Sequence, residues 1–361
     1  MRLLSLFAAS GALVLAACSG ETPKNDASGT EAAMVPASEE LMGSARQVFK
    51  PLPSNQSLPQ GDVATPEKIA LGAMLYFDPR LSASHAISCA SCHSMGLGGA
   101  DAQPTSIGHH WQHGGRNAPT VFNAAFNMAQ FWDGRARDLT DQAGGPMVNP
   151  VEMASAAPHV IEQLKGIPGY RDAFGSAFPG DVDPISLPHA QAAIAAFELT
   201  LVTPNAPFDR YLRGDAAALS VTQKAGLKLF MDKGCTTCHN GMNIGGNMYA
   251  KFGVAQAPGP DLLPRGDLGR FTITKQESDR YAFKVPTLRN IALTAPYFHT
   301  GKVWDLREAI AVMARSQLGT TLSQDEVTKI EAFLQSLTGD QPKIVLPALP
   351  PSVGTTPRPE N

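Results

Sequence analysis

The sequence predicts a mainly α-helical, loop-rich protein in which two related domains follow one another along the chain. Its 361 residues, 43% of them hydrophobic, are enough for two domains with separate cores. The 33 glycines and 29 prolines exceed the usual share and favour a loop-rich fold. Helix-start signals recur along the chain, no convincing sheet pattern is found, and one short motif occurs in both halves.

The repeated motif is a helix with a Gly-x-x-Leu-aromatic pattern, followed by the sequence Cys-x-x-Cys-His. The first copy of the helix pattern begins at Gly72 and the second at Gly226. The first copy has the longer insertion before its cysteines. The repetition predicts two related domains, over residues 45–203 and 204–340, that join near Thr203 and pack around a shared interface.

Other helices are predicted from capping residues and apolar periodicity. Thr65 followed by a proline is typical of a helix start, and residues 186–202 form an amphipathic pattern. Asp305 can cap a helix that runs to about Arg315. Ser323 opens a capping box that precedes an apolar stripe. These signals together make the predicted class mainly α.

The N-terminus has the pattern of an export signal. Arg2 precedes an apolar run that is too short for a comfortable membrane span, and small residues follow. The run ends in Leu-Ala-Ala-Cys18, which resembles the lipobox of bacterial lipoproteins. We therefore expect residues 1–17 to be a signal peptide and Cys18 the site of lipid attachment, with Ser19 favouring the outer membrane. An ordinary signal peptide cut near Cys18 is the alternative.

The two flanking segments differ in composition from the domains between them. Residues 18–44 are rich in small and polar residues and are predicted to be a flexible tether. Residues 341–361 form a proline-rich, extended tail. The formal net charge of −3 gives no electrostatic basis for binding nucleic acid.

The two Cys-x-x-Cys-His motifs indicate covalent attachment of two c-type haems. Two thiols at this spacing can bond both vinyl groups of a haem, while the adjacent histidine ligates the iron. Four of the five cysteines belong to these motifs and the fifth is Cys18, so none remains for a disulfide. A redox dithiol or a zinc ribbon is the alternative interpretation. The motif residues are Cys89, Cys92, His93, Cys235, Cys238 and His239.

The sixth ligand of each iron determines what that haem can do. Methionine opposite histidine raises the reduction potential, and a second histidine lowers it. Met313 shares one face of the helix capped by Asp305 with Leu306 and Ile310 and is the candidate for the second haem, and core packing is the alternative. For the first haem, His109, His110 and His113 lie in a glycine-rich loop, and solvated loop histidines are the alternative.

At this point the chain resembles the bacterial dihaem cytochrome c peroxidases, over about residues 45–340. The resemblance rests on long motifs in both halves. They are Ser-Ile-Gly-His at 106–109, Asn-Ala-Pro-Thr-Val-Phe-Asn at 117–123, Phe-Trp-Asp-Gly-Arg at 131–135, Gln-Ala at 142–143, Asn-Pro-Val-Glu-Met at 149–153 and Ala-Pro-Tyr-Phe-His-Thr-Gly at 295–301. It implies two cytochrome c-like haem domains, the first peroxidatic and the second for electron transfer.

The resemblance also implies roles for individual residues. His109 would be the displaceable sixth ligand of the low-potential first haem, and Met313 the ligand of the high-potential second haem. Trp132 would lie between the haems, while Glu152 and Gln142 would handle peroxide. Two extra imidazoles beside His109 leave a ligand swap open. Calcium would bind between the domains, at Asn117 and the carbonyls of Thr294 and Pro296.

Further expectations concern partners and location. The resemblance implies hydrogen peroxide as substrate, a small cytochrome c or a copper protein as electron donor, and a homodimer. The export signal places the protein in the periplasm, anchored to a membrane by lipid. Two other functions compete: a pure electron carrier, and an enzyme like that of methylamine-dehydrogenase maturation. Glu152 and Gln142 argue against the carrier, and Met313 against the second, because that relative has tyrosine as the axial residue.

Overall fold

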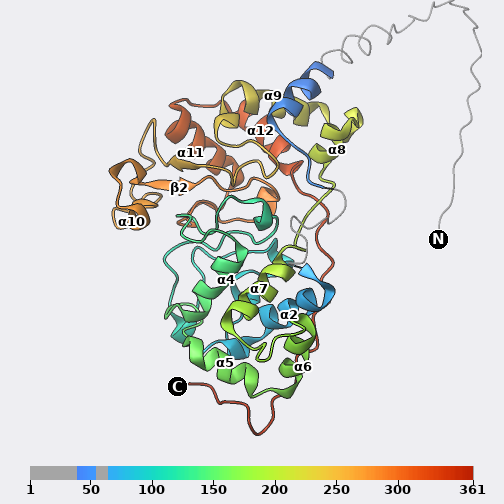
Figure 1. Ribbon diagram of the computed structural model, residues 1–361. Helices are drawn as coiled ribbons and strands as arrows, with labels where there is room; N and C mark the ends of the chain where they lie inside the picture. Colours follow the sequence, from blue (N-terminus) through green and yellow to red (C-terminus); the bar gives the residue numbers. More distant parts are fainter. Residues whose placement is uncertain (1–38, 54–63, 361) are drawn as a thin grey trace, which may run out of the picture.

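The computed structural model describes residues 39–53 and 64–360, which are mainly helical and loop-rich, as predicted. The predicted signal peptide and lipid-attachment site at Cys18 lie outside the described residues. The helices of the first half (residues 64–203) and of the second half (residues 204–340) occupy separate regions of the molecule (Figure 1). The elements are α2 (Pro66–Phe77), α3 (Cys89–Cys92), α4 (Leu139–Val148), α5 (Ala157–Lys165), α6 (Pro168–Ala177) and α7 (Leu187–Glu198), then α8 (Pro207–Arg213), α9 (Val221–Asp232), β1 (Tyr249–Lys251), α10 (Phe271–Thr274), β2 (Ala282–Lys284), α11 (Leu306–Leu318) and α12 (Gln324–Gln335).

The internal repeat is confirmed by two helix crossings of the same geometry. Helix α2 packs against α7 in the first half, and α9 against α12 in the second. A Cβ atom at Gly72 would lie 1.8 Å from the carbonyl oxygen of Ala193, and one at Gly226 would lie 1.8 Å from that of Lys329. Only glycine permits so close an approach of two backbones, which explains why the pattern begins with glycine in both copies.

The predicted helix starts are confirmed by their caps. The side chain of Thr65 accepts a hydrogen bond from an amide in the first turn of α2, and Ser186 does the same for α7. Asp305 accepts from two amides of α11, which extends to Leu318. Ser323 and Glu326 form the expected capping box of α12. These local signals are strong because each cap satisfies amides that have no partner within the helix.

Two predictions about secondary structure need correction. Residues 39–48 are helical and bury Met42, Ala45 and Phe49 in the second half's core, so the predicted tether ends earlier than residue 44. A sheet also exists: β1 and β2 pair antiparallel, with Tyr249 opposite Lys284. Strands of three residues are too short for an alternating pattern to be visible in the sequence. No described helix combines the length and apolar character that a membrane span requires.

The tail after residue 340 packs against the first half, although it leaves the chain from the second. Figure 1 shows it running past α6 to end near α5. The guanidinium of Arg80 donates to the hydroxyl of Ser352 at 2.9 Å, and the amide of Glu360 donates to the carbonyl of Ala83 at 2.8 Å. The tail has no helix or strand, and it links the two halves.

A fully buried ion pair anchors α8 in the second half. Both side chains of Arg289 and Asp209 have 0% exposure, and they share two hydrogen bonds of 2.9 and 3.0 Å. The guanidinium also donates to the carbonyl of Met242, and Asp209 accepts from the amide of Leu52. The pair therefore joins four segments of the chain.

We expect Arg289→Met to destabilise the protein by about 3–5 kcal/mol, because it leaves Asp209 charged and unpaired in the core. The measurement is the unfolding midpoint in guanidinium chloride, followed by circular dichroism. The exposed Arg315 offers a matched control, since Arg315→Met removes the same group from solvent-facing α11. Equal midpoints for the two variants would contradict the prediction.

Candidate functional site

The second haem motif opens onto a cavity of about 440 Å³ between α9, α11 and α12. Its lining includes both predicted iron ligands, His239 and Met313, together with Cys235 and Cys238. The structure thus brings together residues from two distant parts of the sequence. Met313 faces this cavity as well as packing against its helical neighbours.

The imidazole of His239 is held in the form that ligates iron. Its Nδ1 lies 3.3 Å from the carbonyl oxygen of Ile244, which leaves Nε2 for a metal. Burial lowers the pKa of His239 to about 4, so the ring is neutral at physiological pH. A neutral ring with a fixed tautomer fits an axial haem ligand.

The first motif repeats this arrangement. The Nδ1 of His93 lies 3.3 Å from the carbonyl oxygen of Gly99, and burial lowers the pKa of His93. The hydroxyl of Tyr76 donates to the carbonyl of His93 at 2.9 Å, which ties α2 to the motif. In both histidines Nδ1 faces a backbone carbonyl, which leaves Nε2 for iron, and the residues present fit two haems.

The cysteines fit haem attachment better than either alternative. All four motif thiols are unpaired. Burial raises the pKa of Cys89, and raises those of Cys92 and Cys235 to about 11, whereas redox-active dithiols have lowered pKa values. No group of three or more His, Cys, Asp or Glu side chains in the described residues could hold a metal ion.

The loop over residues 105–113 carries His109 and lies against the first haem motif. Burial raises the pKa of the Cys92 thiol, and the nearby Ser106 hydroxyl partly opposes that rise, so the loop reaches the motif. The Nδ1 of His109 is buried and has no hydrogen-bond partner among the described residues. His110 and His113 are exposed, with the ring of His110 stacked on that of His109 at 3.8 Å.

Glu152 is joined to this loop through its backbone. The amide of His109 donates to the carbonyl of Glu152 at 2.8 Å, and a Cβ at Gly108 would lie 2.2 Å from the carbonyl of Val151. The Glu152 carboxylate accepts a hydrogen bond from Asn149 at 2.8 Å. Burial raises the pKa of Glu152, against the opposing effects of Arg135 and Asn149. Glu152 also raises the pKa of both first-motif thiols, so its side chain lies within their electrostatic range.

Gln142 and Trp132 lie in the segments before Glu152. Gln142 is on α4, whose C-terminal end leads directly into the Asn149 turn. Trp132 lines the cavity of the second motif although it belongs to the first half. Its indole donates to the carbonyl of Asn117 at 2.8 Å, and its own carbonyl accepts from the amide of Lys284 at 2.7 Å. The indole thus lies where the two halves meet.

The three predicted calcium ligands also belong to the cavity of the second motif. Asn117, Thr294 and Pro296 all line the second cavity. The amide nitrogen of Asn117 donates to the carbonyl of Gln103, which leaves the amide oxygen for another partner. An amide oxygen and two backbone carbonyls are the donor types that calcium prefers. The residues therefore fit a calcium ion.

Lys284 is a feature of the site that the sequence did not reveal. Its side chain is only 6% exposed and lines the second cavity, and burial alone lowers its pKa to about 8. Among the described residues it forms no ion pair, so its charge has no protein counter-ion. The carboxylates that a haem carries on its propionates would supply that counter-ion. Lys284 differs from a surface lysine only in its position on β2, and the sequence does not reveal that strand.

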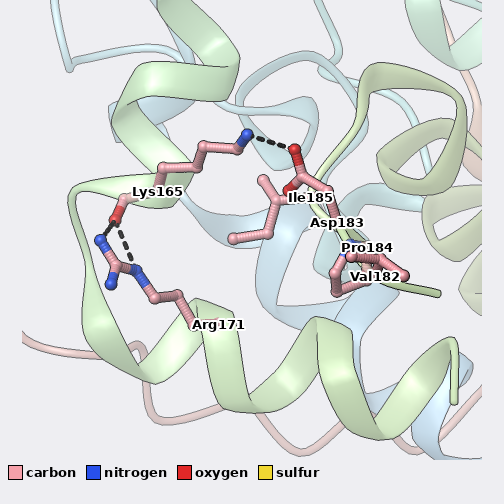
Figure 2. Close-up of a pocket in the computed structure, with 6 residues that line it drawn as sticks. All are labelled: Lys165, Arg171, Val182, Asp183, Pro184 and Ile185. Atoms are coloured by element: carbon pink, nitrogen blue, oxygen red, sulfur yellow. Dashed lines mark hydrogen bonds and ion pairs between the residues drawn. The ribbon is translucent and has the colours of Figure 1, made fainter. Parts of the chain in front are cut away.

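A separate hollow of about 300 Å³ lies on the first half, between α5, α6 and residues 182–185. Figure 2 shows Lys165 reaching across it to Asp183, at 2.6 Å, while Arg171 bonds the carbonyl of Lys165. None of the predicted site residues lines it. The ion pair and hydrogen bonds hold these segments together, and the hollow has no part in the site.

Comparisons with known proteins agree with these features. A family model described as di-haem cytochrome c peroxidase matches residues 66–217. The cytochrome c551 peroxidase of Pseudomonas aeruginosa is 54% identical over 320 residues, covering 88% of this chain and 92% of that protein. The cytochrome c551 peroxidase of Nitrosomonas europaea is 48% identical over 308 residues, covering 84% and 91%.

The fold has a solved counterpart as well. The crystal structure of a MauG-like protein associated with microbial copper homeostasis superimposes with a TM-score of 0.68 at 27% identity, covering 80% of this chain and 93% of that one. Because the sequence relatives match over almost their whole length, the chain belongs to the bacterial di-haem cytochrome c peroxidases, which are oxidoreductases acting on peroxide.

Proposed function

We propose that this protein reduces hydrogen peroxide to water in the periplasm, with electrons from a small cytochrome c or a copper protein. The first haem, on His93, is the peroxide site, and the second, on His239 and Met313, relays electrons to it. The observation that carries the proposal is the meeting of the His109 loop, Glu152 and the first haem motif in one place.

Reduction of peroxide to two waters requires two electrons and two protons. The two haems supply the electrons when bound. Glu152 moves the proton: its carboxylate takes it from one oxygen of peroxide and returns it to the other, which leaves as water. Partial burial suits this task, because it raises the pKa of the carboxyl towards the working pH. Gln142 orients the peroxide beside it.

His109 controls access to the peroxide site. An imidazole of His109 bound to the first iron would keep peroxide from binding there. The hydrogen bond from its amide to the Glu152 carbonyl couples the loop to the acid–base residue, so a movement of one displaces the other. His109 would leave the first iron once the second haem was reduced, and Trp132 is the contact between the two halves.

Calcium at Asn117, Thr294 and Pro296 holds these halves in register. The backbone carbonyl of Asn117 also accepts the hydrogen bond of the Trp132 indole, so the same residue contacts both the ion and the indole. We further propose that the protein is a homodimer. A lipid on Cys18 anchors it to a membrane, which the following serine assigns to the outer membrane.

The test is peroxide-dependent oxidation of a reduced small cytochrome c, with calcium present and the enzyme half-reduced beforehand. We expect rapid turnover that disappears when His109 is kept on the iron or when calcium is removed. Absence of turnover with both haems attached and six-coordinate throughout would favour the pure electron carrier instead.

The hydrogen bond from Asn149 predicts a shift in the pH profile. Asn149→Asp keeps the acceptor for the amide of Val151 but replaces a donor to Glu152 with a like charge. Loss of a hydrogen bond to a charged group costs about 1.5–3 kcal/mol, which corresponds to about one pH unit or more. The pKa of Glu152 therefore rises further.

Because Glu152 must be ionised to accept the proton, activity grows as pH rises through its pKa. We expect the acidic limb of kcat/KM in Asn149→Asp to move to higher pH, with the plateau retained. The measurement is kcat/KM for peroxide as a function of pH. A rate that falls by the same factor at every pH would instead indicate a purely structural effect.

A further inference from the structure

The two helix crossings establish which residues of the two halves occupy equivalent places. At each crossing a glycine lies against a backbone carbonyl and against the Cβ of a phenylalanine. A Cβ added at Gly72 would lie 2.9 Å from the Cβ of Phe197, and one added at Gly226 would lie 3.0 Å from the Cβ of Phe333. Phe197 and Phe333 are therefore equivalent. The residue that follows each one on its helix is Glu198 on α7 and Leu334 on α12.

Leu334 is part of the wall of the second haem cavity. It is 4% exposed and belongs to the second half's core. Because the helix pairs cross in the same way, Glu198 occupies the place in the first half that Leu334 occupies in the second. The apolar Leu334 of the second half thus corresponds to the carboxyl of Glu198 in the first half.

The surroundings of Glu198 agree with this placement. Its side chain is 5% exposed, and its Oε2 is buried without a hydrogen-bond partner among the described residues. Its charge raises the pKa of Cys89, which attaches the first haem, and that of Tyr76, which bonds the carbonyl of His93. The carboxyl therefore lies within electrostatic range of the first haem motif.

We propose that Glu198 is an electrostatic residue of the first haem, whose carboxyl holds the reduction potential of that haem below that of the second. The inference rests on the proposed function, in which the first haem is the low-potential one. An oxidised haem carries one more positive charge than a reduced haem. A nearby carboxylate stabilises the oxidised form, and in a buried place its effect is strong. Leu334 offers the second haem no such stabilisation.

The charge of Glu198 responds to pH and to the haem. Burial raises the pKa of Glu198 to about 8, and an oxidised haem favours the ionised carboxylate. Reduction of the first haem is therefore accompanied by uptake of a proton at Glu198, and its potential falls as pH rises. Tyr76 from α2 shares this environment and is neutral, because burial raises its pKa. Cys89 from α3 carries no charge in the holoprotein, because its sulfur is bonded to the haem.

The experiment is a spectroelectrochemical titration of both haems in the holoprotein, without peroxide, at pH 7 and pH 9. The variants are Glu198→Gln, which keeps the shape and removes the charge, and Glu198→Leu, which copies the second half. We expect a more positive potential for the first haem in both variants, larger at pH 9, and an unchanged second haem. The control is Glu162→Gln, because Glu162 is exposed on α5 of the same half.

An unchanged first-haem potential in Glu198→Gln at both pH values would overturn the inference. So would an equal shift of both haems, since that would indicate a general change in packing. If Glu198→Leu fails to fold, Glu198→Gln alone decides. The titration needs no turnover, so a protein that lacks peroxidase activity yet shows the shift would refute only the proposed function.

Discussion

Replacing Glu152 with glutamine is expected to reduce peroxide turnover by at least about 100-fold, the usual contribution of a general acid–base residue. The amide keeps the shape of the side chain and can still hydrogen-bond to Asn149, but it cannot accept and return a proton. Both haems should remain attached, because Glu152 provides no thiol and no iron ligand. The measurement is the steady-state rate with a reduced cytochrome c, together with the haem content by absorbance.

The matched control for this variant is Glu162→Gln on α5, which is exposed and ten residues away along the chain. We expect it to keep full activity. Turnover in Glu152→Gln within a factor of two of the unmodified protein would remove Glu152 from the proposed mechanism. It would also leave Gln142 and the His109 loop as the groups to test next.

Replacing Met313 with leucine is expected to lower the potential of the second haem and to stop turnover with a cytochrome donor. Leucine fills nearly the same volume, a change that cores usually tolerate for less than about 1.5 kcal/mol. It offers no sulfur to iron, and loss of a methionine ligand removes the factor that raises the potential. The measurements are the redox titration of the second haem and its absorption spectrum.

Met231 provides the control for this variant. It is partly buried on α9 and packs against the second half's core, but it does not line the haem cavity. Met231→Leu should leave both the potential and the spectrum unchanged. If Met313→Leu also left them unchanged, the second iron would have another sixth ligand, and its high potential would need another origin.

The residues that sequence reasoning located correctly are those with local signals. Caps such as Thr65 and Ser323 act within one helical turn, so their patterns can be read without knowing the fold. The haem motifs are equally local, because one short segment carries both thiols and the histidine. Met313 is the exception: its helix was predictable from the sequence, but only the fold brings that helix to the wall of the cavity that His239 lines.

The residues that sequence reasoning missed are buried charges. Lys284 and Glu198 look like ordinary surface charges, and no spacing rule distinguishes them. Lys284 becomes visible as a cavity residue only once β2 is paired with β1, and Glu198 only once the crossing of α2 and α7 is compared with that of α9 and α12. Long-range packing determines such positions, and a single sequence contains no direct record of it.

The two ends of the described chain have a consequence for any attempt to separate the haem domains. The N-terminal helix over residues 39–48 contributes to the core of the second half, while the C-terminal tail is bonded to the first half. If the gene were cut between residues 203 and 204, the first product would carry the helix that packs in the second half. The second product would carry the tail that is bonded to the first half. Neither product alone would therefore fold into a complete mono-haem cytochrome. On mixing, the two products would associate, because each supplies a segment that the other lacks.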